Sequence, residues 1–479
     1  MENGEGYLRF AQNFLWGWFL ILLILGTGVL LTVRTRGVQI NHLGLAFKFI
    51  LKKETSGSGE VSSFAALCTA LSATIGTGNI VGVATAVSSG GPGALFWMLI
   101  AAFFGMATKY AEGLLAVKYR VKGESGFSGG PFYYIENGMG RRFRWLAKLF
   151  AFFGATAGLL GIGTVTQANS ITNSIENFFD SDKSDVLISL GSHNYTLSTV
   201  IGGAVVTLLA ALVIIGGIRR IAALSSVVIP IFSLLFVFFS VLAVICNIQK
   251  LPKAAELIFK SAFNTSSIGG AAVGISVKSA LKYGIGRGIF SNEAGLGSAP
   301  IAAAAAKTRE PVRQGLISMT ATFIDTVLLC TLSGLTIVLT DAYRPEMGLE
   351  GVEITAYAWE TALPFSGKFT SFWLTVFLTV FAFTSILGWN YYAERCLDYL
   401  SGGNPLSLKI FRVFYIAAVF FAPYLSVSAV WQIADIVGAL MAFPNLLALI
   451  SLSSVVSRET ASYFKRCEKR CKTLKNKLY

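Results

Sequence analysis

The chain has 479 residues, of which 54% are hydrophobic and only 13% charged, and its formal net charge is +14. A soluble protein has about a quarter of its residues charged, so this composition argues against a soluble fold. The apolar residues form blocks of about 20 residues without strict alternation, which predicts membrane-spanning helices and not an outer-membrane barrel. The basic residues lie in loops and in the C-terminal tail, which indicates membrane topology and argues against nucleic-acid binding.

Eleven stretches are apolar and long enough to span a membrane as helices. The leading span covers Phe14–Val33. Ten core spans follow, at Phe64–Ser88, Ala94–Val117, Trp145–Ile175, Thr199–Ile215, Ile221–Ile248, Ile268–Ala306, Gly315–Thr340, Thr370–Tyr392, Leu408–Phe421 and Ser426–Val456. The sixth core span is too long for one simple helix and is rich in glycine.

The charges of the loops orient these spans. With eleven spans, most basic clusters fall on the side of the C-terminal tail, and most acidic loop residues fall on the other side. The loop that contains Lys250, Lys253 and Lys260 is the exception. Because basic loops face the cytoplasm, we expect the N-terminus outside and the C-terminus inside the plasma membrane of a bacterium or archaeon.

The ten core spans divide into five and five, and an odd number of spans per half makes the second half run inverted, as in inverted-repeat transporters. We therefore expect four segments. Residues 1–60 hold an extracellular N-terminus, the leading span and a cytoplasmic loop. Residues 61–250 and 251–456 form the first and second five-helix repeats, and 457–479 form a basic cytoplasmic tail.

Such transporters bind substrates near the middle of the membrane on interrupted helices, so the first and sixth core spans should carry matched breaks. The first contains Gly76-Thr77-Gly78-Asn79, and each glycine weakens a helix by about 1 kcal/mol. The sixth contains glycine-rich stretches at 267–274 and 284–288. Amides exposed at a break suit a carboxylate, and the carbonyl groups before it suit sodium or an ammonium group. The alternative is close helix packing through small residues.

Three longer motifs resemble the alanine or glycine:cation symporter family. They are Gly90–Met98, Arg287–Pro300 and Ala434–Asn445, and the resemblance extends from Phe14 to about Leu452. Leu99 departs from the family, which commonly has a second tryptophan there. The resemblance implies an all-α polytopic membrane protein with the leucine-transporter-like fold of the amino acid–polyamine–organocation superfamily, with a 5+5 inverted repeat and one extra N-terminal helix.

The same resemblance implies a substrate site. The backbone amides of Thr77 and Gly78 would hold the carboxylate, Asn79 would stand close by, and Gln167 would add a side-chain hydrogen bond. Trp389 would cap the apolar side of a small pocket. The residues lining the broken sixth span would be Gly269, Gly270 and Val273.

A sodium ion needs about five hard oxygen ligands, which hydroxyl and carbonyl groups supply without burying a full charge. Thr384 and Ser385 look like the hydroxyl pair of the sodium site that this fold shares, and the carbonyl groups of Ser72 and Ile75 would complete it. The alternative for either hydroxyl is a hydrogen bond to its own helical turn.

Several charged residues fall within or beside the predicted spans. Asp325 is either a satisfied structural ion pair or a residue of a gate or cation site, because a carboxylate in the membrane needs a partner or water. Asp435, beside Trp431, has the same two interpretations. Arg287 and Glu293 could form a cytoplasmic gate pair.

We therefore expect a secondary active symporter that imports alanine or glycine with sodium by alternating access, with no cofactor other than the coupling ion. A channel would need a filter sequence, and an enzyme would need clustered catalytic groups. The only two histidines, His42 and His193, lie in predicted loops. A proton-coupled or glutamine-preferring symporter of the same fold is the remaining alternative. The expected partners are the amino acid, sodium and the lipid bilayer, while the oligomeric state stays open, with a monomer as one option.

Overall fold

The computed structural model describes residues 2–52, 54, 57–123, 126–180, 185–190, 193–263, 277–425 and 427–475. Among these residues, nine helices are long and apolar enough to cross a membrane, and one bent helix pair makes a tenth. The remaining predicted span, the sixth core span at 268–306, lies partly outside the described residues. The fold is mostly helical, as expected, with two short hairpins added, β1–β2 (Val121–Gly123, Gly126–Ser128) and β3–β4 (Val186–Leu190, His193–Thr196).

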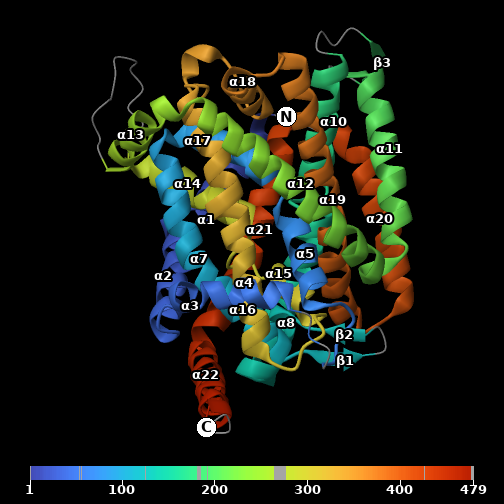
Figure 1. The fold of residues 1–479 in the computed structure, drawn as a ribbon. Helices are drawn as coiled ribbons and strands as arrows, with labels where there is room; N and C mark the ends of the chain where they lie inside the picture. Colours follow the sequence, from blue (N-terminus) through green and yellow to red (C-terminus); the bar gives the residue numbers. More distant parts are fainter. Residues whose placement is uncertain are drawn as a thin grey trace.

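The N-terminal segment supplies one membrane-length helix. It comprises α1 (Glu2–Leu15), α2 (Trp18–Arg34), α3 (Val38–Asn41) and α4 (Leu43–Leu51). The N-terminus lies at one face of the bundle, together with α13 (Leu251–Phe263) and α18 (Val352–Ala362). The hairpin β1–β2 and the C-terminal helix α22 (Ser453–Lys475) lie at the opposite face (Figure 1).

The first core span is broken at its centre. Helix α5 (Ser63–Thr74) starts at Ser62, whose side chain accepts a hydrogen bond from the Ala65 amide and so caps the helix. After Ile75–Thr77 the chain continues as η1 (Gly78–Gly82) and α6 (Val83–Gly90), and the two halves are bent by 53°. Gly91 in a positive-φ conformation and Pro92 then end α6 and turn the chain into α7 (Gly93–Lys118).

The rest of the first half contains a second interrupted span. Its elements are α8 (Pro131–Tyr133), η2 (Tyr134–Met139), η3 (Arg141–Phe143), α9 (Arg144–Leu160), α10 (Val165–Phe179), α11 (Leu197–Ile214), α12 (Gly217–Cys246) and η4 (Ile248–Lys250). Between α9 and α10, residues 161–164 are not helical. Trp145–Ile175, predicted as one unbroken span, is therefore interrupted.

The second half contains α14 (Val277–Asn292), α15 (Ala299–Ala304), α16 (Pro311–Thr322), η5 (Phe323–Cys330), α17 (Thr331–Leu339), η6 (Pro345–Met347), α19 (Gly367–Ser401), α20 (Pro405–Phe421), η7 (Ala422–Tyr424) and α21 (Val427–Ser451). The predicted break at 284–288 is wrong, because these residues lie inside the continuous helix α14. Gly284 and Gly288 instead allow close packing, since a Cβ on either would press against Ala94 or Met98 of α7. The stretch 267–274 lies outside the described residues.

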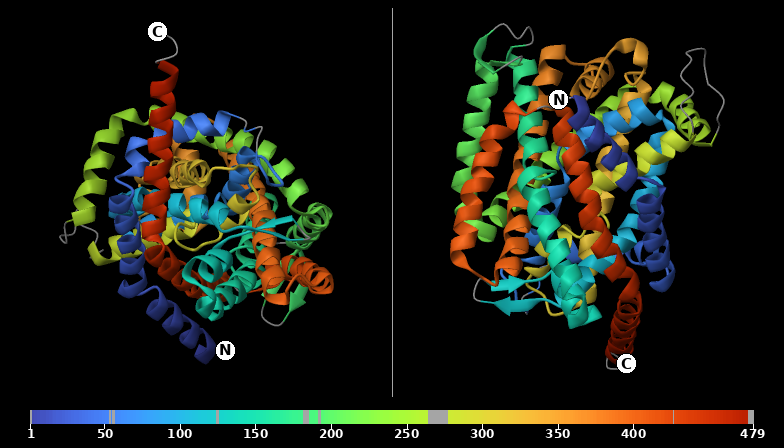
Figure 2. Two further views of the ribbon diagram at one scale, coloured as in Figure 1. Left: turned by 90° about the horizontal axis from the view of Figure 1, so that it is seen from below. Right: turned by 180° about the vertical axis from the view of Figure 1, so that it is seen from behind.

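The helices form an inner and an outer group. Helix α7 packs against α14 and α16 and is two-thirds buried, as is α21. Helices α11 and α20 lie at the edge of the bundle, and only 33% and 22% of their apolar windows are buried (Figure 2). The broken first span therefore lies among well-packed helices, while α11 and α20 present apolar surface suited to lipid.

Candidate functional site

Two side chains, one from the same span and one from another helix, bond the amide groups at the break in the first core span. Asn79 accepts a hydrogen bond from the Gly76 amide at 3.1 Å, and Gln167 of α10 accepts one from the Thr77 amide at 3.3 Å. These peptide groups would otherwise be unsatisfied in the membrane interior, where an unpaired amide is costly. The Thr77 hydroxyl oxygen is buried and has no hydrogen-bond partner among the described residues. The break thus presents polar groups that an amino-acid ligand could use.

The break in the third core span places Gln167 at this site. Gln167 donates to the carbonyl of Ile162, which lies in the non-helical stretch 161–164, at 3.0 Å. The Tyr415 hydroxyl donates to the carbonyl of Gly163 at 3.2 Å. The repeated glycines at 161 and 163 are the signal that could have revealed this break from sequence.

Trp389 of α19 covers the same region. Gly163 lies directly against its side chain, and a Cβ at that position would overlap the tryptophan. The Trp389 indole donates to the Glu293 carboxylate at 2.8 Å. Thr77, Asn79 and Trp389 are fully buried, and Gln167 is 2% exposed. The predicted residues of the first, third and eighth core spans therefore meet in one closed site.

The described break in the sixth core span lies at 293–298, between α14 and α15. Glu293, Gly295 and Gly297 all have positive φ angles, which end the helix. The Ala294 amide is capped by the Asn292 side chain at 2.9 Å. Because Gly78 packs closely against Ser291, a Cβ there would lie 3.1 Å from the Ser291 Cα atom. The broken first span thus contacts the sixth span at Ser291 of α14, just before the described break, while the predicted break at 267–274 lies outside the described residues.

Asp325 joins these two spans to the seventh. Its carboxylate accepts hydrogen bonds from Asn79 at 2.8 Å, Ser291 at 2.8 Å and Thr326 at 2.7 Å. Asp325 lies in η5, where the helix widens to π geometry, as often happens at functional sites. It therefore has a satisfied set of polar partners from three helices.

A group of oxygen atoms gathers beside the break. The Ser385 hydroxyl lies 3.0 Å from the Ser72 carbonyl oxygen, 3.2 Å from that of Ile75 and 3.1 Å from that of Phe381. Its single proton can be donated fully to only one of the three carbonyls. The Thr384 hydroxyl donates to the same Phe381 carbonyl at 2.9 Å. Two hydroxyl oxygens and three carbonyl oxygens therefore lie close together with only two hydroxyl protons among them, an arrangement that suits a small hard cation.

A buried charged cluster, which was not predicted from the sequence, lies next to the break in the sixth span. Lys109 of α7 is 1% exposed, and its ammonium group has no hydrogen-bond partner among the described residues. It interacts electrostatically with the carboxylates of Glu112, Glu293 and Asp325. Glu112 accepts hydrogen bonds from the Gly295 amide at 3.1 Å and from Asn445 at 2.7 Å. A lysine and a glutamate within the predicted span Ala94–Val117 were the available signal.

The predicted gate pair of Arg287 and Glu293 is wrong. Arg287 lies 3.5 Å from the Asp435 carboxylate and contacts the ring of Trp431. Glu293 instead accepts from Trp389 and from the Ser298 hydroxyl. The Asp435 carboxylate also accepts a hydrogen bond from the Gln12 side chain at 2.6 Å. Of the two interpretations of Asp435, the structure therefore supports a satisfied structural ion pair.

Three predicted substrate residues, Gly269, Gly270 and Val273, lie outside the described residues. Of the described ones, the structure brings Thr77, Gly78, Asn79, Gln167 and Trp389 to one region. It places Ser72, Ile75 and Ser385 in contact on the other side of the break, with Thr384 sharing a carbonyl with Ser385.

The chain is similar to known proteins over nearly its whole length. The family described as the sodium:alanine symporter family matches residues 1–477. A sodium/alanine symporter of Methanococcus maripaludis is 41% identical, with 95% of this chain and 96% of that protein covered. A probable sodium/glutamine symporter of Bacillus subtilis is 34% identical, with 96% and 90% covered.

Among solved structures, the fold is similar to that of MhsT in complex with L-phenylalanine. The TM-score is 0.53 at 12% sequence identity, and 84% of this chain and 98% of that chain are covered. At this identity the likeness concerns the fold alone. It confirms the leucine-transporter-like fold that the sequence predicts.

Proposed function

Because the chain belongs to the sodium:alanine symporter family, we propose that it imports a small neutral amino acid, alanine or glycine, together with sodium by alternating access. The family consists of symporters, so the protein is a multi-pass membrane transporter and not an enzyme. The observation that carries the proposal is the break at Ile75–Thr77, which has amide groups on one side and convergent carbonyl oxygens on the other.

The amide side of the break suits the substrate. The positive end of the following half-helix and the amides of Thr77 and Gly78 favour a carboxylate. The unpartnered Thr77 hydroxyl and the Gln167 amide group add hydrogen-bonding capacity within reach of that carboxylate. In our proposal Trp389, which packs directly against Gly163, caps the apolar side of the pocket, and a small pocket would favour alanine or glycine over larger amino acids.

The carbonyl side of the break suits the coupling ion. In our proposal sodium binds the carbonyl oxygens of Ser72 and Ile75 and the hydroxyl oxygens of Thr384 and Ser385. Ion binding would relieve the crowding of carbonyl oxygens around one hydroxyl proton, because the hydroxyl oxygen then becomes a ligand. The ion and the amino acid would share one interrupted turn, and this provides a physical basis for their coupling.

The driving force is adequate for accumulation. One sodium ion moving inward through about 100 mV releases roughly 2.3 kcal/mol. A tenfold sodium gradient adds about 1.4 kcal/mol, and the total of about 3.7 kcal/mol supports roughly 500-fold accumulation of a zwitterion. Because the zwitterion carries no net charge, the cycle would move positive charge inward.

The orientation in the membrane is part of the proposal. By sequence, Arg141, Arg142 and Arg144 lie between β1–β2 and α9 and the C-terminal tail is basic, whereas Asp341, Glu346 and Glu350 lie between α17 and α18. Figure 1 shows β1–β2 and α22 at one face of the bundle and α18 at the opposite face. By the positive-inside rule, the first face would be cytoplasmic, with the N-terminus outside.

The test is uptake of labelled alanine into proteoliposomes. We expect uptake to require an inward sodium gradient, to produce an inward current and to be competed by glycine more strongly than by glutamine. Uptake that is independent of sodium would contradict the coupling. The alternative, a proton-coupled or glutamine-preferring symporter, predicts uptake driven by a pH gradient alone or competition led by glutamine.

A further inference from the structure

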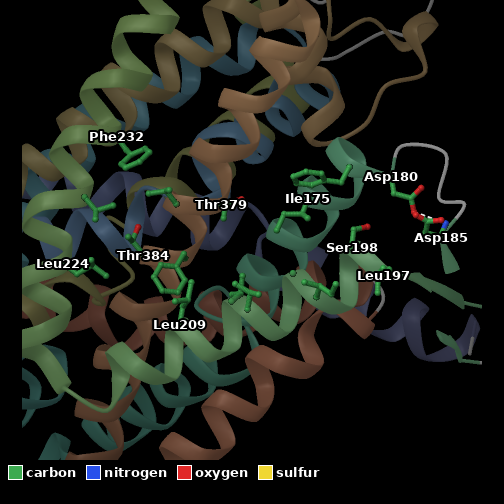
Figure 3. Close-up of a pocket in the computed structure, with 18 residues that line it drawn as sticks. Ile175, Asp180, Asp185, Leu197, Ser198, Leu209, Leu224, Phe232, Thr379 and Thr384 are labelled. Carbon is green, nitrogen blue, oxygen red and sulfur yellow. Dashed lines mark hydrogen bonds between the residues drawn. The ribbon is translucent and has the colours of Figure 1, made fainter. Parts of the chain in front are cut away.

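A long apolar cavity lies between four helices, away from the break described above. It has a volume of about 630 Å³ and is enclosed by α10, α11, α12 and α19. Figure 3 shows side chains from these helices pointing into it, including Ile175, Leu209, Leu224 and Phe232. On α11 its lining extends from Leu197 to Leu209, a distance of about 18 Å at the rise of an α-helix.

The position of the cavity identifies the kind of molecule that can fill it. Its walls belong to helices that are long and apolar enough to span the membrane, and α11 is only one-third buried. Ile201 and Val205 of α11 line the cavity and are 53% and 49% exposed, so the cavity opens toward the bilayer. Water needs several polar partners to be stable in such a space, and these walls offer few. A length of about 18 Å exceeds half of the roughly 30 Å hydrocarbon core, as an acyl chain entering from one leaflet would require.

The mouth of the cavity has a different chemistry. Asp180 and Asp185 line the end near the start of α11, and the Asp185 amide donates to the Asp180 carboxylate at 3.3 Å (Figure 3). The connecting residues 181–184 lie outside the described part of the chain. Asp180 and Asp185 are both carboxylates, and none of the described residues that line the cavity is basic. This net negative charge favours a headgroup with an exposed amine and disfavours an anionic headgroup.

We propose that this cavity binds one acyl chain of an amine-bearing phospholipid, a phosphatidylethanolamine, whose headgroup amine lies at Asp180 and Asp185. The acyl chain lies along α11 and reaches Thr384 of α19 at the inner end of the cavity. The tip of the lipid therefore contacts the residue whose hydroxyl shares the Phe381 carbonyl with Ser385. If the proposed sodium site is correct, the bound lipid also stabilises that site.

Lipid retention can be measured without reference to transport. The full-length protein is purified from vesicles that contain equal amounts of phosphatidylethanolamine, phosphatidylcholine and phosphatidylglycerol with identical acyl chains, and native mass spectrometry counts the lipids retained. We expect one phosphatidylethanolamine per chain. Val205→Trp fills the middle of the cavity and should reduce retention of the lipid at least about tenfold, which corresponds to a loss of about 1.4 kcal/mol in binding free energy.

Leu208→Trp is the matched control, because Leu208 is on the same helix, is 63% exposed and does not line the cavity. It should retain the lipid as the wild type does. Combined Asp180→Asn and Asp185→Asn substitutions should keep one bound lipid but abolish the preference for phosphatidylethanolamine over phosphatidylcholine. Equal retention by Val205→Trp and wild type would overturn the proposal, as would preferred retention of phosphatidylglycerol or a dimer that buries the cavity.

The link to sodium is tested separately. Alanine uptake is measured in vesicles of phosphatidylcholine and phosphatidylglycerol with and without phosphatidylethanolamine. We expect phosphatidylethanolamine to lower the half-saturating sodium concentration in wild type and Leu208→Trp, but not in Val205→Trp. If lipid is retained without this shift, the lipid site stands and the link to the proposed sodium site fails.

Discussion

Replacing Ser385 with alanine tests the proposed ion site at the atom where the most contacts converge. The Ser385 hydroxyl oxygen is 3.0–3.2 Å from three carbonyl oxygens, so the substitution removes one of about five expected ion ligands and changes little else in volume. Interactions of polar groups with full charges contribute about 1.5–3 kcal/mol, compared with 0.5–1.5 kcal/mol for neutral pairs. We therefore expect the half-saturating sodium concentration to rise about 10- to 150-fold.

Ser72→Ala is the matched control for this experiment. Its hydroxyl donates to the Thr69 carbonyl within its own helix at 2.8 Å, and only the Ser72 backbone carbonyl faces the proposed ion. The sodium dependence of alanine uptake in proteoliposomes should therefore be nearly unchanged in Ser72→Ala. If Ser385→Ala kept a sodium dependence within about twofold of wild type, or if both variants shifted equally, Ser385 would not be an ion ligand.

Three further outcomes follow from the same geometry. Gly163→Ala should abolish alanine uptake by the folded protein, because the added Cβ would overlap Trp389. Gly82→Ala is the control and should remain active, because no atom lies nearer than 3.9 Å to its added Cβ; equal uptake by the two variants would contradict the prediction. Trp389→Phe removes the 2.8 Å hydrogen bond to Glu293 and should raise the half-saturating alanine concentration about 10-fold or more. An unchanged half-saturating concentration would show that this hydrogen bond does not contribute to alanine binding. Alanine at 100 times its Kd should stabilise the protein by about 2.7 kcal/mol in sodium but not in potassium, as measured by thermal unfolding, and equal stabilisation would argue against coupling.

The sequence was sufficient to predict the break in the first span. Of the two breaks predicted in the sixth span, the one at 284–288 is wrong and the one at 267–274 lies outside the described residues. Gly76 and Gly78 are two residues apart, a spacing that places them on different faces of a helix, so packing alone does not account for both. Gly284 and Gly288 are four apart and share one face, and the structure uses them for close packing against α7. The break at 293–298 begins at Glu293, a residue type that rarely adopts a positive φ, so local propensity did not indicate where the helix ends, although Gly295 and Gly297 follow it.

Side-chain partners were harder to predict than backbone breaks. The motif containing Arg287 and Glu293 suggested that they pair, but six residues along a helix place them on different sides. Their actual partners, Asp435 and Trp389, come from helices more than 90 residues away in the chain. Tertiary packing decides which long-range pairs form, and sequence periodicity contains no information about it. The recognised motifs located the site because they identify a family whose fold is shared, whereas composition and hydropathy located only the spans.

The geometry of the break explains how an ion and an amino acid could depend on each other. The carbonyl of Ile75 faces Ser385, and the amide of Thr77, two residues later, faces Gln167. Rotation of this short non-helical segment would move both groups together, so a ligand that fixes one also fixes the other. If the competent conformation of the segment is populated to about 1% without sodium, ion binding could raise alanine affinity by up to about 100-fold. Asp325, bound to Asn79 and to Ser291, would carry the same movement into the sixth span.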